Sequence, residues 1–128
     1  METVIHLSMA ELEAGMENIR QTPKDSGVLK MIVRRPEVDN RESLQEAELS
    51  LDEGLVGDNW RIRGSRHMPD GSANLNAQVT IMNARSIALI AQTENRWPLA
   101  GDQLYIDLDL SADNLPPGTR LAIGSAVI

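Results

Sequence analysis

Basic side chains gather in one short polar stretch of an otherwise acidic chain. Arg61, Arg63 and Arg66 stand close together, and His67 follows directly. Guanidinium groups present planar sets of donors that match phosphate oxygens, so this pattern indicates an anion site. A solvated loop that balances an acidic protein is the alternative interpretation. His67 could ligate a metal or titrate near neutrality, but without a second ligand beside it a surface role is the simpler interpretation.

The distribution of charge supports an anion site in the middle of the chain. Residues 1–53 hold twelve acids against six bases, residues 54–100 three against five, and residues 101–128 four against one. The formal charge of −7 and the pI near 4.7 argue against a nucleic-acid partner, which needs an excess of Lys and Arg. Three aromatic residues in all are too few for stacking on single-stranded nucleic acid.

The carboxylates offer weaker candidates. Asp58 follows Gly57 and could bind a ligand amine or cap a turn, and the turn is the simpler interpretation. Asp107 and Asp109 are expected on the solvent face of a strand, and Asp113 at a corner, so we expect no metal site. The chain has no cysteine and no serine in a nucleophile motif, and we therefore expect no catalytic residue within it.

The elements that position these groups follow from capping and periodicity. Residues 1–27 are expected to form a helix and a turn, since Ser8 and Glu11 make a capping box and Thr22-Pro23 ends the apolar repeat. A second helix, capped by Asn83, is predicted near residues 84–92. Residues 61–77 show neither the helical nor the strand periodicity of apolar residues, and this predicts an extended loop. Strands are predicted over residues 28–33, 44–49, 78–82, 104–110, 121–123 and 126–128.

Three segments together resemble one known family. GLVGD from Gly54, QVTIMNARSIALIA from Gln78 and the run from Pro98 to Ile128 are similar to the MOSC domain, the C-terminal domain of molybdenum cofactor sulfurases. The resemblance covers roughly residues 54–128. The most specific part is the run from Gly101, with an acid and an amide at Asp102 and Gln103, where the family more often has Glu and Asn.

The resemblance implies a mainly β, α+β fold in which residues 28–128 form a closed β-barrel, with the N-terminal helix and the helix near 84–92 outside it. It also implies that the domain binds molybdenum cofactor or transfers sulfur, through a cysteine that follows the Leu-x-Ile-Gly strand. This chain ends before that cysteine, and only His67 to Gly71 resembles the family's His-Gly-Gly element. The residues expected to bind the cofactor are Asp58, Arg61, Arg63, Arg66, His67, Asp102 and Gln103.

The leading functional hypothesis is therefore a MOSC-type module that binds an anionic pterin cofactor or handles sulfur transfer. The alternative is a non-catalytic barrel that acts through protein contacts or as a homo-oligomer. The apolar ending at Val127 and Ile128 would leave an unpaired strand edge, which favours pairing with another chain or a missing C-terminal part. No pyridoxal phosphate, nucleic acid or membrane partner is expected, and the expected location is the cytoplasm.

Overall fold

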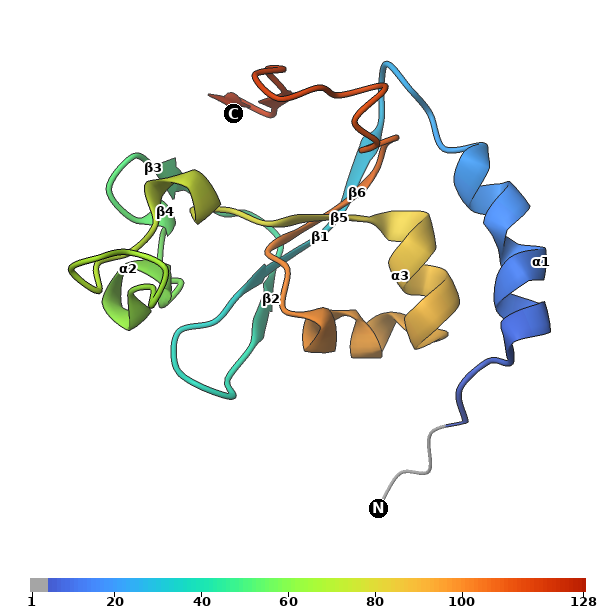
Figure 1. The fold of residues 1–128 in the computed structure, drawn as a ribbon, viewed down its shortest axis with the longest axis horizontal. Coiled ribbons are helices and arrows are strands. Elements are labelled where there is room, and N and C mark those ends of the chain that lie inside the picture. Colours follow the sequence, from blue (N-terminus) through green and yellow to red (C-terminus); the bar gives the residue numbers. More distant parts are fainter. Residues whose placement is uncertain (1–4) are drawn as a thin grey trace.

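The computed structural model describes residues 5–128 as an α+β fold with 27% helix and 20% strand. A small sheet lies in the middle of the molecule, as Figure 1 shows. Helices α1 (Met9–Arg20) and α3 (Ala84–Ala91) lie on one side of it, and short strands with connecting loops lie on the other. None of the described helices has the length and apolar character that crossing a bilayer requires.

The central sheet has four strands in the order β2-β1-β6-β5. The long strand β1 (Val28–Arg34) pairs antiparallel with β2 (Glu42–Leu44) and with β6 (Leu104–Asp107), while β5 (Ile81–Asn83) runs parallel to β6. Strand β1 confirms the strand predicted over residues 28–33, whereas β2 ends at Leu44, where the next predicted strand begins.

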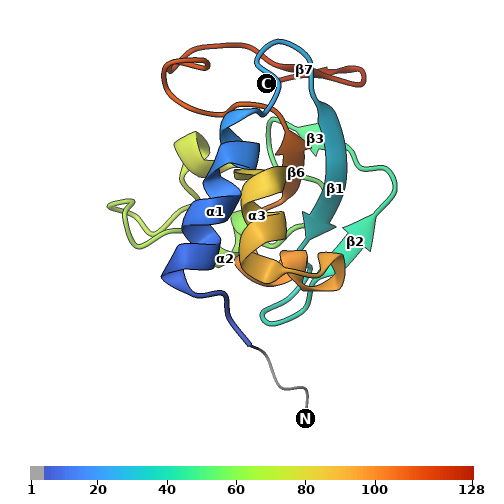
Figure 2. The ribbon, with the colours of Figure 1, turned by 90° about the vertical axis from the view of Figure 1, so that its right-hand side faces the viewer.

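Helices close the first face of this sheet. Ser8 and Glu11 form the expected capping box of α1, and the Asn83 side chain accepts a hydrogen bond from the Ser86 backbone N–H at the start of α3. Figure 2 shows α1 and α3 side by side in front of the sheet. The 3-10 helix η2 (Glu94–Ala100) continues this layer. The core on this face consists of Val33, Ala84, Ile87, Trp97 and Tyr105.

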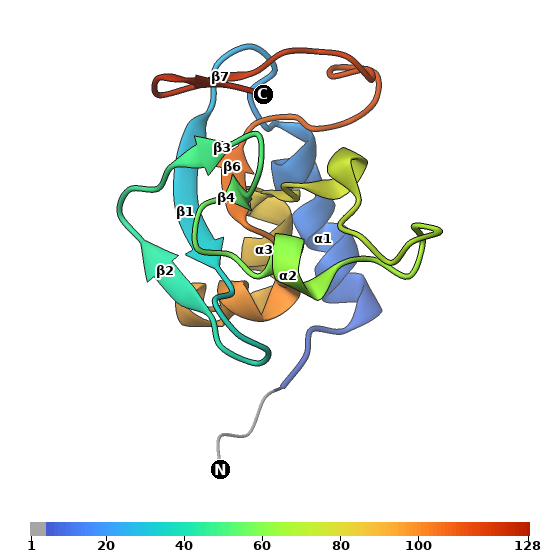
Figure 3. The same cartoon turned by 90° about the vertical axis from the view of Figure 1, so that its left-hand side faces the viewer.

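The second face carries a less regular cover. Two short hairpins, β3–β4 (Leu49–Ser50 and Gly54–Leu55) and β7–β8 (Ala122–Ile123 and Ala126–Val127), lie over it, as Figure 3 shows. Between them the chain forms the short helix α2 (Trp60–Arg63) and the 3-10 turn η1 (Leu75–Ala77). The buried core residues on this face are Ile32, Leu55, Leu104, Ile106 and Leu108.

The predicted closed barrel is wrong. Its strands over residues 28–128 form one four-stranded and two separate two-stranded sheets in the described chain. Closure requires every strand to pair on both sides. Here the strands of the second face are two residues long and pair only within their own hairpins, so the hydrogen-bond ladder does not continue around the sheet.

Two local expectations also need correction. Strand β6 ends at Asp107, and Leu104, Tyr105 and Ile106 are all buried because helices cover one face and hairpins the other. The predicted strand over residues 104–110, with Asp107 and Asp109 on a solvent face, is therefore shorter than expected and is covered on both faces. The loop over residues 61–77 is interrupted by α2 and η1.

The final strand is paired within the chain. The Ile128 N–H donates to the Leu121 carbonyl at 2.8 Å, and the Leu121 N–H donates to the Ile128 carbonyl at 2.7 Å. Ile128, which is 37% exposed, thus has both backbone groups paired with Leu121, whereas the expected unpaired strand edge lies, within the described residues, on the other side of β8, at Val127. The expected homo-oligomer stays a prediction.

Candidate functional site

Two of the predicted site residues meet in a buried polar junction. The side chain of Asp58, from the GLVGD segment, is fully buried. Gln103, from the GDQL segment, is 1% exposed, and its Nε2 donates to Asp58 Oδ2 at 3.4 Å. Residues that are 45 positions apart in the chain are thus in contact. The fold thus brings together two of the three segments on which the family resemblance depends.

Strand ends and backbone groups hold this junction in place. Asp58 Oδ1 accepts from the Arg35 backbone N–H at 2.6 Å and from Arg35 Nε at 3.3 Å, and Oδ2 accepts from the Trp60 N–H at 3.1 Å. Gln103 Oε1 accepts from the Thr80 N–H at 2.8 Å and its hydroxyl at 2.6 Å. The polar atoms of Asp58 and Gln103 are therefore occupied by the protein, and their role is to position the chain around them.

Sequence reasoning missed Arg35, which is the cationic partner of Asp58. Its side chain is 18% exposed and follows β1 directly, while its backbone carbonyl accepts from the Asn59 N–H at 2.7 Å. The signal for it was slight: two arginines in succession close an apolar strand, and a buried aspartate needs a cation nearby. The ion pair fixes the start of the basic loop against the end of β1.

The basic residues lie beyond this junction, on the surface. Arg61, Arg63, Arg66 and His67 are all exposed, and none of them forms an ion pair within residues 5–128. Arg61 and Arg63 are two positions apart on α2, so their side chains point in different directions. The four residues form a basic surface, which we define by these positions, instead of a single guanidinium fork.

The loop that carries the basic surface is closed on itself. Ser65 donates its N–H to the Gly71 carbonyl at 3.3 Å and to the Ser72 carbonyl at 3.0 Å. Gly64 has a φ of 68°, and a Cβ there would lie 2.3 Å from the Gly71 carbonyl oxygen, so glycine is required. Asp70 accepts from the Ser72 hydroxyl and N–H, which lowers its pKa. These contacts keep its carboxylate within the turn.

Asp102 does not belong to the basic surface. It is partly buried beside Tyr105, whose hydroxyl donates to the Trp97 carbonyl at 2.9 Å. Burial raises the pKa of Tyr105 to about 12, and the negative charge of Asp102 adds to this shift. Asp102 therefore lies next to the helix-side core, whereas the adjacent residue, Gln103, contacts Asp58.

Two further observations bear on what the site can hold. No group of three or more His, Cys, Asp or Glu in the described part of the chain could hold a metal ion. The amide oxygen of Asn59, next to Asp58, is buried without a hydrogen-bond partner among the described residues. An unpaired buried acceptor is costly, so Asn59 marks a point of incomplete polar packing at the base of the loop.

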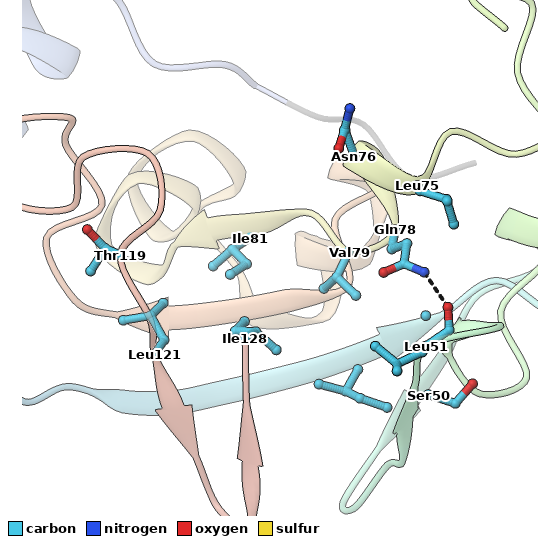
Figure 4. A pocket seen from close by; sticks show the side chains of 12 residues that line it. Ser50, Leu51, Leu75, Asn76, Gln78, Val79, Ile81, Thr119, Leu121 and Ile128 are labelled. Atoms are coloured by element: carbon cyan, nitrogen blue, oxygen red, sulfur yellow. Dashed lines mark hydrogen bonds between the residues drawn. The ribbon is translucent and has the colours of Figure 1, made fainter.

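Two open cavities lie on the second face. One of about 550 Å³ is lined by β3, the η1 turn and both ends of the β7–β8 hairpin, and Figure 4 shows the side chains around it. Another of about 560 Å³ lies between the segment before β3 and the tip of the same hairpin. Leu49 lines both.

Comparison of this chain with known proteins identified no relative. No protein-family model matches the chain, and neither a curated protein nor a solved structure matches it.

Proposed function

We propose that this chain is a MOSC-type binding module whose basic surface holds the phosphate end of an anionic pterin cofactor. The observation that carries the proposal is that Arg61, Arg63, Arg66 and His67 are exposed and free of ion pairs within residues 5–128 of a chain with a formal charge of −7. Exposed cationic groups that have no carboxylate partner of their own attract anions. The proposed setting is the cytoplasm.

The buried junction supports this proposal because it gives the loop a fixed base. Asp58 ties the loop to Arg35 at the end of β1 and to Gln103 ahead of β6. Binding groups held by rigid elements lose less entropy when a ligand arrives. Asp58 and Gln103 are thus positioning residues in the proposal, and the arginines are the binding residues.

The donor set fits one part of the cofactor only. Three guanidinium groups suit a phosphate, which accepts several charge-assisted hydrogen bonds. The metal end finds no matching cluster of ligands among the described residues, and the chain lacks the thiolate that would bind molybdenum or carry sulfur. Molybdenum cofactor supplies oxygen-transfer redox chemistry when bound. The residues of this chain bind and orient the anion, and we assign no reaction step to them.

The test is a calorimetric titration of pyrophosphate into the parent and into a variant with Arg61, Arg63 and Arg66 replaced by Ala. Loss of the charge-assisted bonds should weaken binding about tenfold or more and should flatten its dependence on salt. The matched control replaces Arg20, Lys30 and Arg120 by Ala, which changes the net charge equally at exposed positions outside the loop. Equal weakening in both variants would show that only net charge matters.

Stability provides the second readout. The three arginines are exposed, so their replacement should change the free energy of unfolding by less than about 0.5 kcal/mol per site. Identical isotherms for parent and variant, or no binding by the parent, would remove the anion site from this loop.

A further inference from the structure

The strand β8 has one unused edge. Leu121 and Ile128 exchange both backbone hydrogen bonds, and Ala122 opposes Val127 in the next pair. Hydrogen-bonded and non-hydrogen-bonded pairs alternate in an antiparallel ladder. The N–H and C=O of Val127 therefore point away from β7. Its side chain is 54% exposed, and no backbone partner within residues 5–128 bonds to these two groups.

The strand β3 has a matching unused edge. The Val56 N–H donates to the Glu48 carbonyl at 2.9 Å, and the following pair joins Leu49 and Leu55. By the same alternation, the N–H and C=O of Leu49 point away from β4. They too lack a backbone partner in the described chain.

Both cavities of the second face lie between the strands that carry these two edges, although Val127 itself lines neither of them. The cavity of about 550 Å³ reaches from Leu49 to Ile128, and the cavity of about 560 Å³ reaches from Leu49 to Ala126. Figure 4 shows Ser50 and Leu51 across from Ile128, with Ile81 above Ile128 and Val79 between Ile81 and Leu51. The space between β3 and β8, which we term the slot, is thus bordered by two free strand edges and floored by aliphatic side chains.

Exposed apolar residues gather at the same place. Leu51 is 90% exposed and Leu75 is 69% exposed, and both line the slot together with Ile128. Such groups gain free energy when a partner removes them from water. Unpaired backbone donors and acceptors on both sides specify that this partner supplies an extended backbone.

The charges around the slot further define the kind of partner that can bind there. Glu46 and Glu48 line the slot, and Asp52 and Glu53 lie exposed just beyond it. None of these four carboxylates forms an ion pair within the described residues, and no Lys or Arg lines either cavity. A partner strand with flanking lysines or arginines would complement this border.

We infer that the slot is a docking site for an extended segment of a partner protein, with apolar side chains at alternate positions and basic residues at its ends. The segment adds as a strand between β3 and β8, so that its backbone bonds Leu49 on one side and Val127 on the other. Its apolar side chains point into the two cavities. This inference does not depend on the anion site.

The probe is a synthetic peptide, acetyl-KKTVSVTVKK-amide, titrated into the parent chain. Its counterpart carries N-methyl groups on the three valines, which removes the donors along one edge and keeps the side chains and charge. The parent should bind the unmethylated peptide at least about tenfold more tightly, since several backbone hydrogen bonds are lost with the other. Equal binding of the two peptides, or binding of neither, would overturn strand addition.

Protein variants test the site itself. Val127→Pro removes the free N–H without touching a bond to β7 and should weaken binding about fivefold. Val127→Thr keeps the N–H and should bind like the parent. Replacing Glu46 and Glu48 by Gln should weaken binding and flatten its salt dependence. Unchanged affinity in a folded Val127→Pro variant, judged by far-ultraviolet circular dichroism, would overturn the placement.

A second copy of the chain is the competing occupant, and sedimentation distinguishes it. If β8 paired with β8 of another copy, the parent would dimerise at micromolar concentration without peptide and Val127→Pro would abolish the dimer. That result would overturn the proposal in favour of self-association. A parent that is monomeric while it binds the peptide supports the proposal.

Discussion

The two faces of the central sheet differ in how tightly side chains pack against them. On the helix face, Tyr105 is fully buried, Val33 is 1% exposed, and the Trp97 and Tyr105 rings lie 5.9 Å apart between their centroids. On the opposite face, cavities of about 550 and 560 Å³ remain beneath two short hairpins. The first face is closed by packing, whereas the second retains space and free strand edges.

The scarcity of aromatic residues accounts for this difference. The chain has two Trp, one Tyr and no Phe, and aromatic side chains fill the most volume and bury the most area. Trp97 and Tyr105 are both used on the helix face, and Trp60 lies at the start of α2. Aliphatic residues on two-residue strands must close the other face. We therefore expect the helix face to supply stability and the second face to supply binding.

The largest effect should come from Tyr105→Ala. Removal of a fully buried ring and its hydrogen bond to Trp97 should lower the free energy of unfolding by about 4 kcal/mol, measured by urea denaturation. Tyr105→Phe, which loses only the hydroxyl, should cost about 1 kcal/mol. A loss below that of Tyr105→Phe in the Ala variant would contradict the assignment of stability to this face.

A smaller effect should follow from Leu55→Ala on the opposite face. Leu55 is 1% exposed and lines one of the cavities, so some of its surroundings are already empty. Its truncation should cost about 2 kcal/mol, at the low end for a buried leucine. The same urea denaturation measures it, and a loss equal to that of Tyr105→Ala would show that the two faces are packed alike.

The smallest effect concerns the chain that leads from β6 to the β7–β8 hairpin. The Ser111 N–H, followed by the Lys24 ammonium, lowers the pKa of Asp109 from 3.8 to about 2. Because the folded-state pKa is depressed, the stabilisation is present above about pH 4 and is lost as the pH falls towards 2. Asp109→Asn should therefore flatten the decline in unfolding free energy over that range.

The control for the Asp109→Asn variant is its unfolding at higher pH. Parent and Asp109→Asn should show parallel dependence of unfolding free energy on pH above about pH 5, where Asp109 is ionised in both folded and unfolded chains. Indistinguishable slopes between pH 2 and pH 4 would show that the contacts of Asp109 with Ser111 and Lys24 do not anchor this segment.

Local chemistry made the helices and several strands predictable. The Ser8 and Asn83 caps depend on neighbouring residues, and both are present as expected. The corner near Asn114 is also as expected, since its side-chain amide donates to the backbone carbonyls of Lys24 and Asp109. Interactions within a few residues need no knowledge of the rest of the chain.

The sequence indicated which residues belong to the candidate site, but not which residues they contact. The sequence indicated Asp58, Gln103 and the arginines, but their separation into a buried junction and an exposed surface depends on contacts across 23 to 45 positions. Arg35 went unrecognised because its partner is distant along the chain. A pairwise contact between remote residues leaves no local period or motif to detect.

The sequence by itself determined the acidic charge, the two capped helices and several of the strand-forming segments, because composition, capping and local periodicity encode them. Only the tertiary structure decided that the strands form an open sheet with two detached hairpins instead of a barrel. Register and strand partners arise from packing between segments far apart in the chain, and the same β pattern is compatible with several such arrangements. The slot between β3 and β8 is a consequence of that arrangement.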